Sequence, residues 1–192
     1  MTLWLARHAT PCGVQGCCYG ALEVAAEAQH TLRAAQALAL QLPPGVALYC
    51  SPRQRCQVLA QALQDLRPEL HYRIDERLAE MDFGVWEGVP WSQIPKAEFD
   101  RWTADFSHYR FGGRESVQMV LQRVGAAWDA ARADPARQGA GVVWLTHAGV
   151  ARAATLLAQG RRTLLRASDW PQQAPAFGSS WRLALDGAGN GG

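Results

Sequence analysis

The sequence predicts an α/β fold: a three-layer sandwich in which a mostly parallel central sheet is flanked by helices, with a small lid segment at about 81–114. Two observations favour this fold class. Short apolar, β-branched or aromatic runs alternate with longer runs of helical composition, as they do in layered α/β domains. Residues suited to bind anions also follow three of the predicted strands, and open α/β sheets bind ligands at that edge.

Five short segments have the composition of strands. They are Leu3 to Ala6, Val46 to Cys50, His71 to Asp75, Val142 to Thr146 and Ser180 to Leu185. The first helix is predicted from Glu27 to Leu42, a segment rich in Ala, Leu and Gln. Pro43 and Pro44 end it, because proline removes a backbone donor and restricts the residue before it. The first connection is therefore strand to helix to strand.

The second helix is predicted from Ser51 to Leu66. Ser51 is a suitable N-cap, Pro52 suits the first turn, and Gln54 completes a capping box. Its apolar stripe is Val58, Leu59, Ala62, Leu63 and Leu66. Arg55 precedes that stripe by three and four residues, so it lies on the face turned toward the sheet. It is also near a helix start, whose free N–H groups favour anions. We therefore expect Arg55 to have an anionic partner.

Two further helices are predicted from Glu115 to Arg132 and from Val150 to Gln159, where Gly160 ends the second one. Residues 160–178 have the composition of a long loop, and we expect the Gly-rich end at 187–192 to be frayed.

The composition is typical of one soluble domain spanning residues 1–192, with 48% hydrophobic and 19% charged residues. No apolar run is long enough for a membrane helix, and no secretory signal precedes the first strand, so we expect a cytoplasmic protein. The net charge of +2 and the dispersed arginines argue against a nucleic-acid partner.

The cysteines indicate neither a disulfide framework nor a metal site. They are odd in number, lack paired C-x-x-C spacing, and are read as reduced thiols. They are Cys12, Cys17, Cys18, Cys50 and Cys56.

Candidate functional residues follow three strands. Arg7 and His8 come after the first, the Ser51–Arg55 segment after the second, and Thr146 with His147 after the fourth. Because the carboxyl ends of parallel strands meet at one edge, these residues are expected to converge there.

Four sequence elements, in order, resemble the histidine phosphatase, or phosphoglycerate mutase-like, superfamily. Leu5-Ala6-Arg7-His8-Ala9-Thr10 is similar to its R-H-G signature, with alanine in place of the usual glycine. Ser51-Pro52-Arg53-Gln54-Arg55-Cys56-Gln57 resembles S-P-x-x-R-A-x-Q. Residues 78–88 match L-x-E-x-x-F-G-x-W-E-G, and 146–150 match the second-histidine element.

The resemblance implies a role for each matching residue. His8 would attack phosphorus and become a phosphohistidine, while Arg7, Arg55 and His147 would hold the phosphoryl oxygens. The phosphate-binding arginine would be Arg55 and not Arg53. Glu80 would protonate the leaving group and later take a proton from water. The resemblance implies no metal and no cofactor.

The segment Gly16-Cys17-Cys18-Tyr19-Gly20 is similar to the G-x-C-Y-G stretch of α-ribazole phosphatases, which act late in cobalamin assembly. It implies a small phosphorylated metabolite as substrate, with Tyr19 and Gly20 among its binding residues. The alternative is that Tyr19 and Gly20 only shape a turn.

Aromatic residues are dense between positions 81 and 114, and there they either cap the pocket by stacking on a flat substrate or form the lid's own small core. They are Phe83, Trp86, Trp91, Phe99, Trp102, Phe106, Tyr109 and Phe111.

Two other functions stay open. One is a phosphoglycerate mutase, although those relatives are generally longer. The other is a non-catalytic phospho-ligand-binding module, which Ala9 permits and which His8 and Glu80 together argue against.

Overall fold

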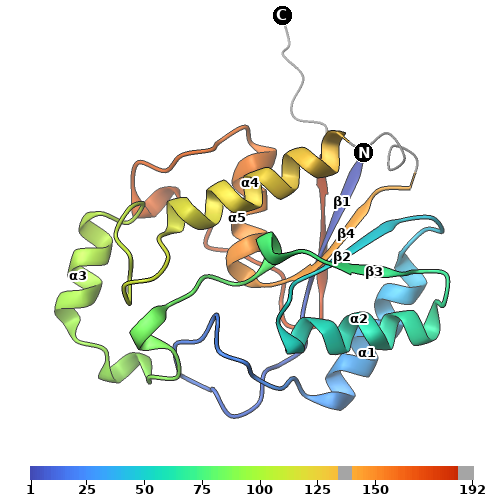
Figure 1. Cartoon of the computed structure of the whole chain (residues 1–192), viewed down its shortest axis with the longest axis horizontal. Coiled ribbons are helices and arrows are strands. Elements are labelled where there is room, and N and C mark those ends of the chain that lie inside the picture. The colour runs from blue at the N-terminus through green and yellow to red at the C-terminus, as the bar shows by residue number, and fades with distance from the viewer. Residues whose placement is uncertain (134–139, 186–192) are drawn as a thin grey trace, which may run out of the picture.

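A five-stranded sheet lies at the centre of the protein, as seen in a computed structural model that describes residues 1–133 and 140–185 (Figure 1). The strand order is β3-β2-β4-β1-β5, and only β5 is antiparallel to its neighbour. The strands are β1 (Thr2–Arg7), β2 (Ala47–Cys50), β3 (Tyr72–Ile74), β4 (Val142–Thr146) and β5 (Ser180–Ala184). This mixed, mostly parallel sheet confirms the predicted α/β fold class.

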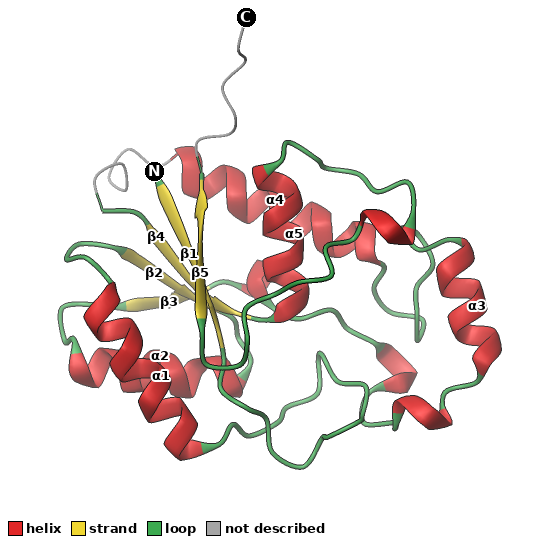
Figure 2. Ribbon diagram, turned by 180° about the vertical axis from the view of Figure 1, so that it is seen from behind, coloured by secondary structure: helices red, strands yellow, loops and turns green. Residues whose placement is uncertain are grey.

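Helices cover both faces of the sheet (Figure 2). The helices α1 (Ala28–Gln41) and α2 (Gln54–Leu66) pack on one face, and α4 (Val117–Ala133) and α5 (Ala148–Ala158) on the other. Alternate residues of β4 enter the two cores: Val142 and Trp144 face α4 and α5, whereas Val143 and Leu145 face α1 and α2. Burial on both faces explains the continuous apolar run of this strand.

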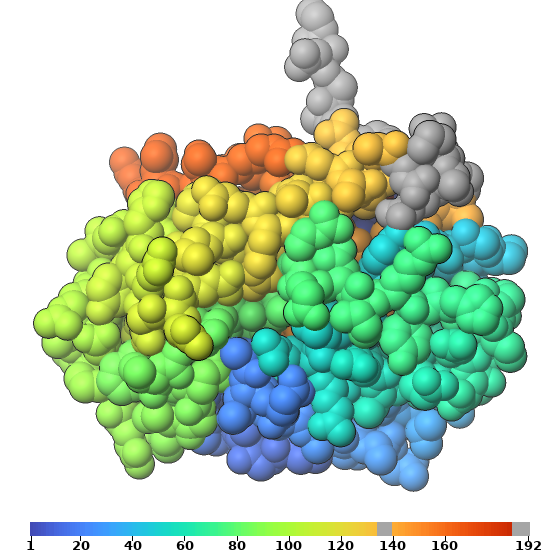
Figure 3. Space-filling model, in the orientation of Figure 1, coloured from blue at the N-terminus to red at the C-terminus, as the bar shows by residue number. Residues whose placement is uncertain are grey.

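The 81–114 segment lies to one side of the sheet and contains α3 (Lys96–Ala104) (Figures 1 and 3). Its aromatic rings pack around Phe111, which is fully buried with Cys18 and Ile94. Trp102 stacks on Phe111 with 4.4 Å between ring centroids. The segment therefore has a small core of its own, as one of the two sequence alternatives expected. Short 3-10 helices in the described residues are Glu76–Leu78, Gly84–Trp86, Trp91–Gln93 and Ala167–Asp169.

The start of α2 corrects the sequence prediction. The helix begins at Gln54, and the side chain of its N-cap residue, Arg53, makes no capping hydrogen bond; the Gln54 N–H donates to Glu23 instead, at 3.0 Å. The predicted capping box is wrong, because the Ser51 hydroxyl is hydrogen-bonded to His147 instead. The buried face of α2 is also rotated around the helix relative to the predicted apolar stripe. Its members Val58 and Leu66 are 38% and 47% exposed. The residues buried with Arg55 are Cys56, Leu59, Ala60 and Leu63.

Other helix ends differ by one or two residues. The helix α4 starts at Val117 and not at Glu115, because the Ser116 hydroxyl accepts a hydrogen bond from the Met119 N–H at its start. The helix α5 starts at Ala148, two residues before Val150. The predicted frayed end at 187–192 lies outside the described residues. Within the described ranges, no helix is long and apolar enough to span a bilayer.

Leu63→Ala and Leu66→Ala test which face of α2 is buried. Leu63 is fully buried between α2 and the sheet. Its truncation should lower the free energy of unfolding by about 2–5 kcal/mol. Leu66→Ala should cost about 0.5 kcal/mol, as surface changes usually do. Urea denaturation measures both, and equal losses would contradict the observed orientation of the helix.

Candidate active site

The sheet brings the predicted functional residues together at one edge. Arg7, the last residue of β1, pairs with Thr146, the last residue of β4. The β2 residue Cys50 pairs with Leu145 on the other side of β4. The residues that follow the three strands therefore meet, and the rings of His8 and His147 lie 5.2 Å apart between centroids.

His8 is buried and neutral. Its Nδ1 donates a hydrogen bond to the Ala9 carbonyl at 2.7 Å, so the lone pair is on Nε2. Burial lowers the pKa of His8 to about 3, and the charge of Arg55 contributes. A neutral imidazole with a free Nε2 lone pair can act as a nucleophile. The replacement of glycine by Ala9 costs no backbone strain, since every described residue with positive φ is a glycine.

Arg55 is fully buried, and its charge is met by backbone carbonyls. Its Nη1 donates to the Leu22 carbonyl at 2.9 Å and its Nη2 to the Gly20 carbonyl at 2.6 Å. No carboxylate of the described residues forms an ion pair with it. Arg53, in contrast, is paired with Glu23 at 3.0 Å.

Glu87 holds the loop that carries those carbonyls. Its carboxylate accepts hydrogen bonds from the backbone N–H groups of Gly20, Ala21, Leu22 and Phe83, at 2.9–3.0 Å. The peptide unit between Gly20 and Ala21 thus donates its N–H to Glu87 and offers its C=O to Arg55. One amide dipole lies between the two opposite charges, which favours both. No local sequence pattern indicates this role of Glu87, although the residue belongs to the matched 78–88 element.

Arg7 lies beside His8, and the Phe177 ring covers its guanidinium group. The Phe177 ring centroid is 3.7 Å from the guanidinium carbon, and Nη1 donates to the Pro175 carbonyl at 3.1 Å. Tyr19 contacts Arg7 and also lies near Arg55, with 5.5 Å from its ring centroid to the guanidinium carbon. Burial lowers the pKa of Arg7 and raises that of Tyr19. Phe177 was missed because the 160–178 loop has no sequence pattern.

His147 is fixed by Ser51. The Ser51 hydroxyl accepts from the Arg53 N–H at 3.2 Å and lies 2.7 Å from Nε2 of His147. Its own proton can therefore go to Nε2, which leaves the His147 proton on Nδ1. Burial and the charge of Arg55 hold the pKa of His147 well below its usual value.

Unpaired buried nitrogen atoms gather at this edge, among them Nε of Arg7, Nε of Arg55 and Nδ1 of His147; Nε of Arg53 and Nε of Arg152 also have no hydrogen-bond partner. Buried donors are rarely left unpaired, so unpaired ones mark a place for a ligand. Two cations and a neutral imidazole N–H suit an anion such as a phosphoryl group. These are the residues that the sequence predicts for that task.

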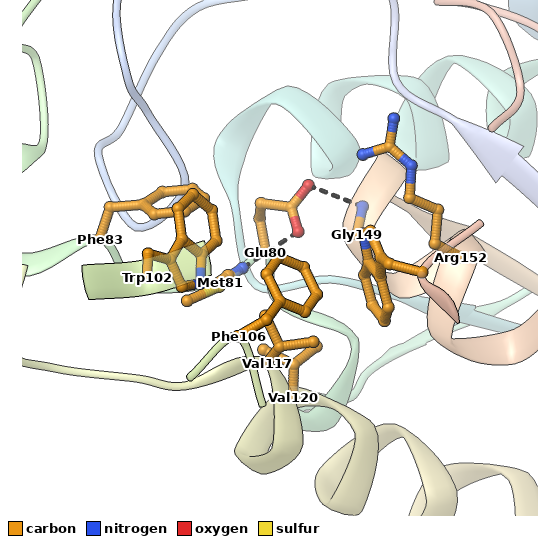
Figure 4. A pocket seen from close by; sticks show the side chains of 10 residues that line it. Glu80, Met81, Phe83, Trp102, Phe106, Val117, Val120, Gly149 and Arg152 are labelled. Atoms are coloured by element: carbon orange, nitrogen blue, oxygen red, sulfur yellow. Dashed lines mark hydrogen bonds between the residues drawn. The ribbon is translucent and has the colours of Figure 1, made fainter. Parts of the chain in front are cut away.

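Glu80 lies at the border between this edge and an apolar cavity of about 230 Å³ (Figure 4). Its carboxylate accepts from the N–H of Met81 at 3.0 Å and from the N–H of Gly149, in the first turn of α5, at 3.1 Å. A Cβ on Gly149 would lie 2.3 Å from the carboxylate, so the approach requires glycine. The cavity is lined by Glu80, Met81, Phe83, Trp102, Phe106, Val117, Val120, Gly149, Arg152 and Trp170.

Gly20 serves Arg55 through its backbone. Its carbonyl binds Arg55, its N–H binds Glu87, and a Cβ would lie 1.8 Å from the Met81 carbonyl oxygen. Contact of Tyr19 and Gly20 with a substrate stays a prediction. No cluster of three or more potential metal ligands occurs in the described parts of the chain.

The buried histidines predict a pH dependence of stability. The unfolded chain takes up protons below about pH 6.5, whereas folded His8 stays neutral down to about pH 3. The free energy of unfolding should therefore fall as the pH falls below 6.5, by up to about 1.4 kcal/mol per pH unit for each such histidine. Between pH 7 and 5, the free energy of unfolding of His8→Asn should fall by about 2 kcal/mol less than that of the wild type. Urea denaturation measures this, with the exposed His71→Asn as control. Equal pH dependence in wild type and His8→Asn would contradict a neutral, buried His8.

Comparison with known proteins shows that the fold is shared with solved phosphatase structures. The α-ribazole phosphatase from Shigella flexneri has a similar structure, with a TM-score of 0.76 and 25% identity, covering 95% of this chain and 89% of that one. The mycobacterial glucosyl-3-phosphoglycerate phosphatase gives a TM-score of 0.76 at 21% identity, covering 94% and 88%.

A Caenorhabditis elegans 6-phosphofructo-2-kinase/fructose-2,6-bisphosphatase is 36% identical over 85 residues, which are 42% of this chain and only 18% of that protein. Residues 3–174 match the Histidine phosphatase superfamily (branch 1). Since that match spans most of the chain, this protein belongs to the histidine phosphatase superfamily, branch 1.

Proposed function

We propose that this protein hydrolyses a small phosphate monoester through a phosphohistidine formed on His8. The observation that carries the proposal is the set of unpaired buried donors on Arg7, Arg55 and His147 around a neutral imidazole. Most of the barrier to phosphoryl transfer is lowered by holding charge on the transferring group, and two fixed guanidinium groups supply that charge.

In the first step, Nε2 of His8 attacks phosphorus while the ester P–O bond breaks. The electron pair of that bond leaves with the oxygen, which takes a proton from the protonated carboxyl of Glu80 and departs as an alcohol. The N–P bond formed keeps the phosphoryl group between Arg7, Arg55 and His147.

In the second step, water attacks the phosphoryl group. Glu80, now a carboxylate, takes a proton from that water, and the N–P bond breaks with its electron pair returning to Nε2. The products are inorganic phosphate, neutral His8 and protonated Glu80, so the enzyme returns to its starting state.

A rapid-quench experiment with radiolabelled p-nitrophenyl phosphate tests the proposal. We expect an acid-labile, base-stable phosphoprotein with the wild type and with the surface control His71→Ala, but none with His8→Ala. An adduct that persists in His8→Ala would show that another residue is the nucleophile. Binding without turnover in the wild type would favour the non-catalytic module.

For the substrate, we propose α-ribazole 5'-phosphate, of cobalamin biosynthesis. Three observations support this choice: the Gly16–Gly20 stretch resembles that of α-ribazole phosphatases, the cavity beside Glu80 is lined by aromatic rings, and a solved α-ribazole phosphatase has a similar structure. A flat ring suits stacking in such a cavity. The leaving group must lie near Glu80, because Glu80 protonates it, and the cavity begins there.

A panel of monoesters distinguishes the candidates. We expect kcat/KM to be higher for α-ribazole 5'-phosphate than for 3-phosphoglycerate or glucosyl-3-phosphoglycerate. Phe106→Ala, which removes a ring of the cavity, should lower kcat/KM for α-ribazole 5'-phosphate by about 10-fold and leave 3-phosphoglycerate less affected. Phe99→Ala is the control, because Phe99 packs in the same segment outside the cavity. A preference for 3-phosphoglycerate with transfer of its phosphoryl group would favour a mutase instead.

A further inference from the structure

The backbone that carries Glu80 is held on both sides by one ion pair. Arg123, on α4, and Glu115, two residues before that helix, are joined by two hydrogen bonds: Nε to Oε1 at 2.7 Å and Nη2 to Oε2 at 3.0 Å. The pair packs against the chain between Arg77 and Asp82.

Arg123 binds the chain before Glu80. Its Nη1 donates to the carbonyls of Arg77 and Ala79, at 2.8 and 2.7 Å. Glu115 binds the chain after Glu80. Its Oε2 accepts from the Asp82 N–H at 3.1 Å, and its own N–H donates to the Asp82 carbonyl at 3.3 Å. The two charged residues therefore fix the peptide groups on either side of Glu80.

The carboxylate of Glu80 depends on this support. Its own hydrogen bonds come from two backbone N–H groups, those of Met81 and Gly149. The Met81 N–H belongs to the segment that Arg123 and Glu115 hold, and the Gly149 N–H belongs to α5. The position of the carboxylate therefore follows the position of the backbone. A shift of about 1 Å in a reacting group can cost on the order of 10²-fold in rate.

We propose that Arg123 and Glu115 are positioning residues that aim Glu80 at the leaving-group oxygen. The proposal rests on the function given above, in which Glu80 is the acid and base. The pair is little exposed, at 20% and 14% of the side chains. Because the cost of desolvating such a pair offsets much of its attraction, its main contribution is direction and not stability.

Only an arginine can make this set of contacts. Its planar fork uses two nitrogens for Glu115 and the third for two carbonyls, whereas a lysine has a single ammonium group. Arg123→Lys keeps the charge and removes the fork, which separates geometry from electrostatics. Glu115→Gln keeps an oxygen for the Asp82 N–H and removes the charge.

The test compares phenyl phosphate with p-nitrophenyl phosphate, two aryl esters of similar shape. Phenolate is a poor leaving group and needs the acid, whereas p-nitrophenolate departs without much help. Glu80→Gln should lower kcat/KM for phenyl phosphate by about 10²–10⁴-fold, and much less for p-nitrophenyl phosphate. Arg123→Lys and Glu115→Gln should show the same selectivity with a loss on the order of 10²-fold or less. Inhibition by vanadate, which reports the phosphate site, should be unchanged.

Arg162→Lys is the matched control. Arg162 makes a two-bond ion pair with Asp129, which lies on α4 after Arg123, and neither bond involves the 77–82 segment. Arg162→Lys should not lower kcat/KM for one of the two substrates more than for the other. Adding Arg123→Lys to Glu80→Gln should bring no further selective loss, since both changes act on the same group.

The outcomes separate the two levels of the proposal. If Glu80→Gln affects both substrates equally, the assignment of Glu80 as the acid is wrong. The positioning role is wrong if Glu80→Gln selectively lowers kcat/KM for phenyl phosphate but Arg123→Lys and Glu115→Gln do not. It is also wrong if these two variants bind vanadate more weakly than the wild type. Thermal unfolding is measured for each variant, and should one fail to fold, the other decides.

Discussion

The charge of Arg55 is buried without a carboxylate beside it, and much of the surrounding chain is arranged to accommodate that charge. Taking a charge out of water costs several kcal/mol unless hydrogen bonds replace the lost hydration. Here the carbonyls of Gly20 and Leu22 replace it, and Glu87 holds the loop that presents them. Since no carboxylate neutralises the guanidinium directly, its attraction stays available to an anion. A direct ion pair would stabilise the empty protein and weaken the binding of phosphate.

Around Glu80, too, backbone groups bind the functional side chain while charged side chains hold the backbone. Its carboxylate is bound by backbone N–H groups, while the full charges of Arg123 and Glu115 cancel each other one layer away. Charged side chains thus orient the backbone, and the backbone orients the reacting groups. Such preorganised dipoles need not rearrange during the reaction, which is the main electrostatic advantage of an enzyme site over water.

The fold and the candidate residues could be predicted because local signals carry them. Strand composition gave the five strands, and the edge where parallel strands end places His8, Arg55 and His147 together. Partners far apart in the chain could not be predicted. Ser51 has the pattern of a helix cap, yet its hydroxyl binds a histidine 96 positions later. The contacts of Phe177 and Arg123 likewise depend on tertiary packing that no local periodicity encodes.

The last strand, β5, has a consequence for how the protein is made. The β1 strand pairs only with β4 and β5 within the sheet, both from the last third of the chain. The residues just before β5 also complete the surroundings of β1's end, since the Gly178 N–H binds the His8 carbonyl and Phe177 covers Arg7. During synthesis the first strand therefore has no partner strand until β4 has left the ribosome, and its second partner, β5, follows later still. A growing chain therefore has no complete phosphate site until β5 has paired with β1.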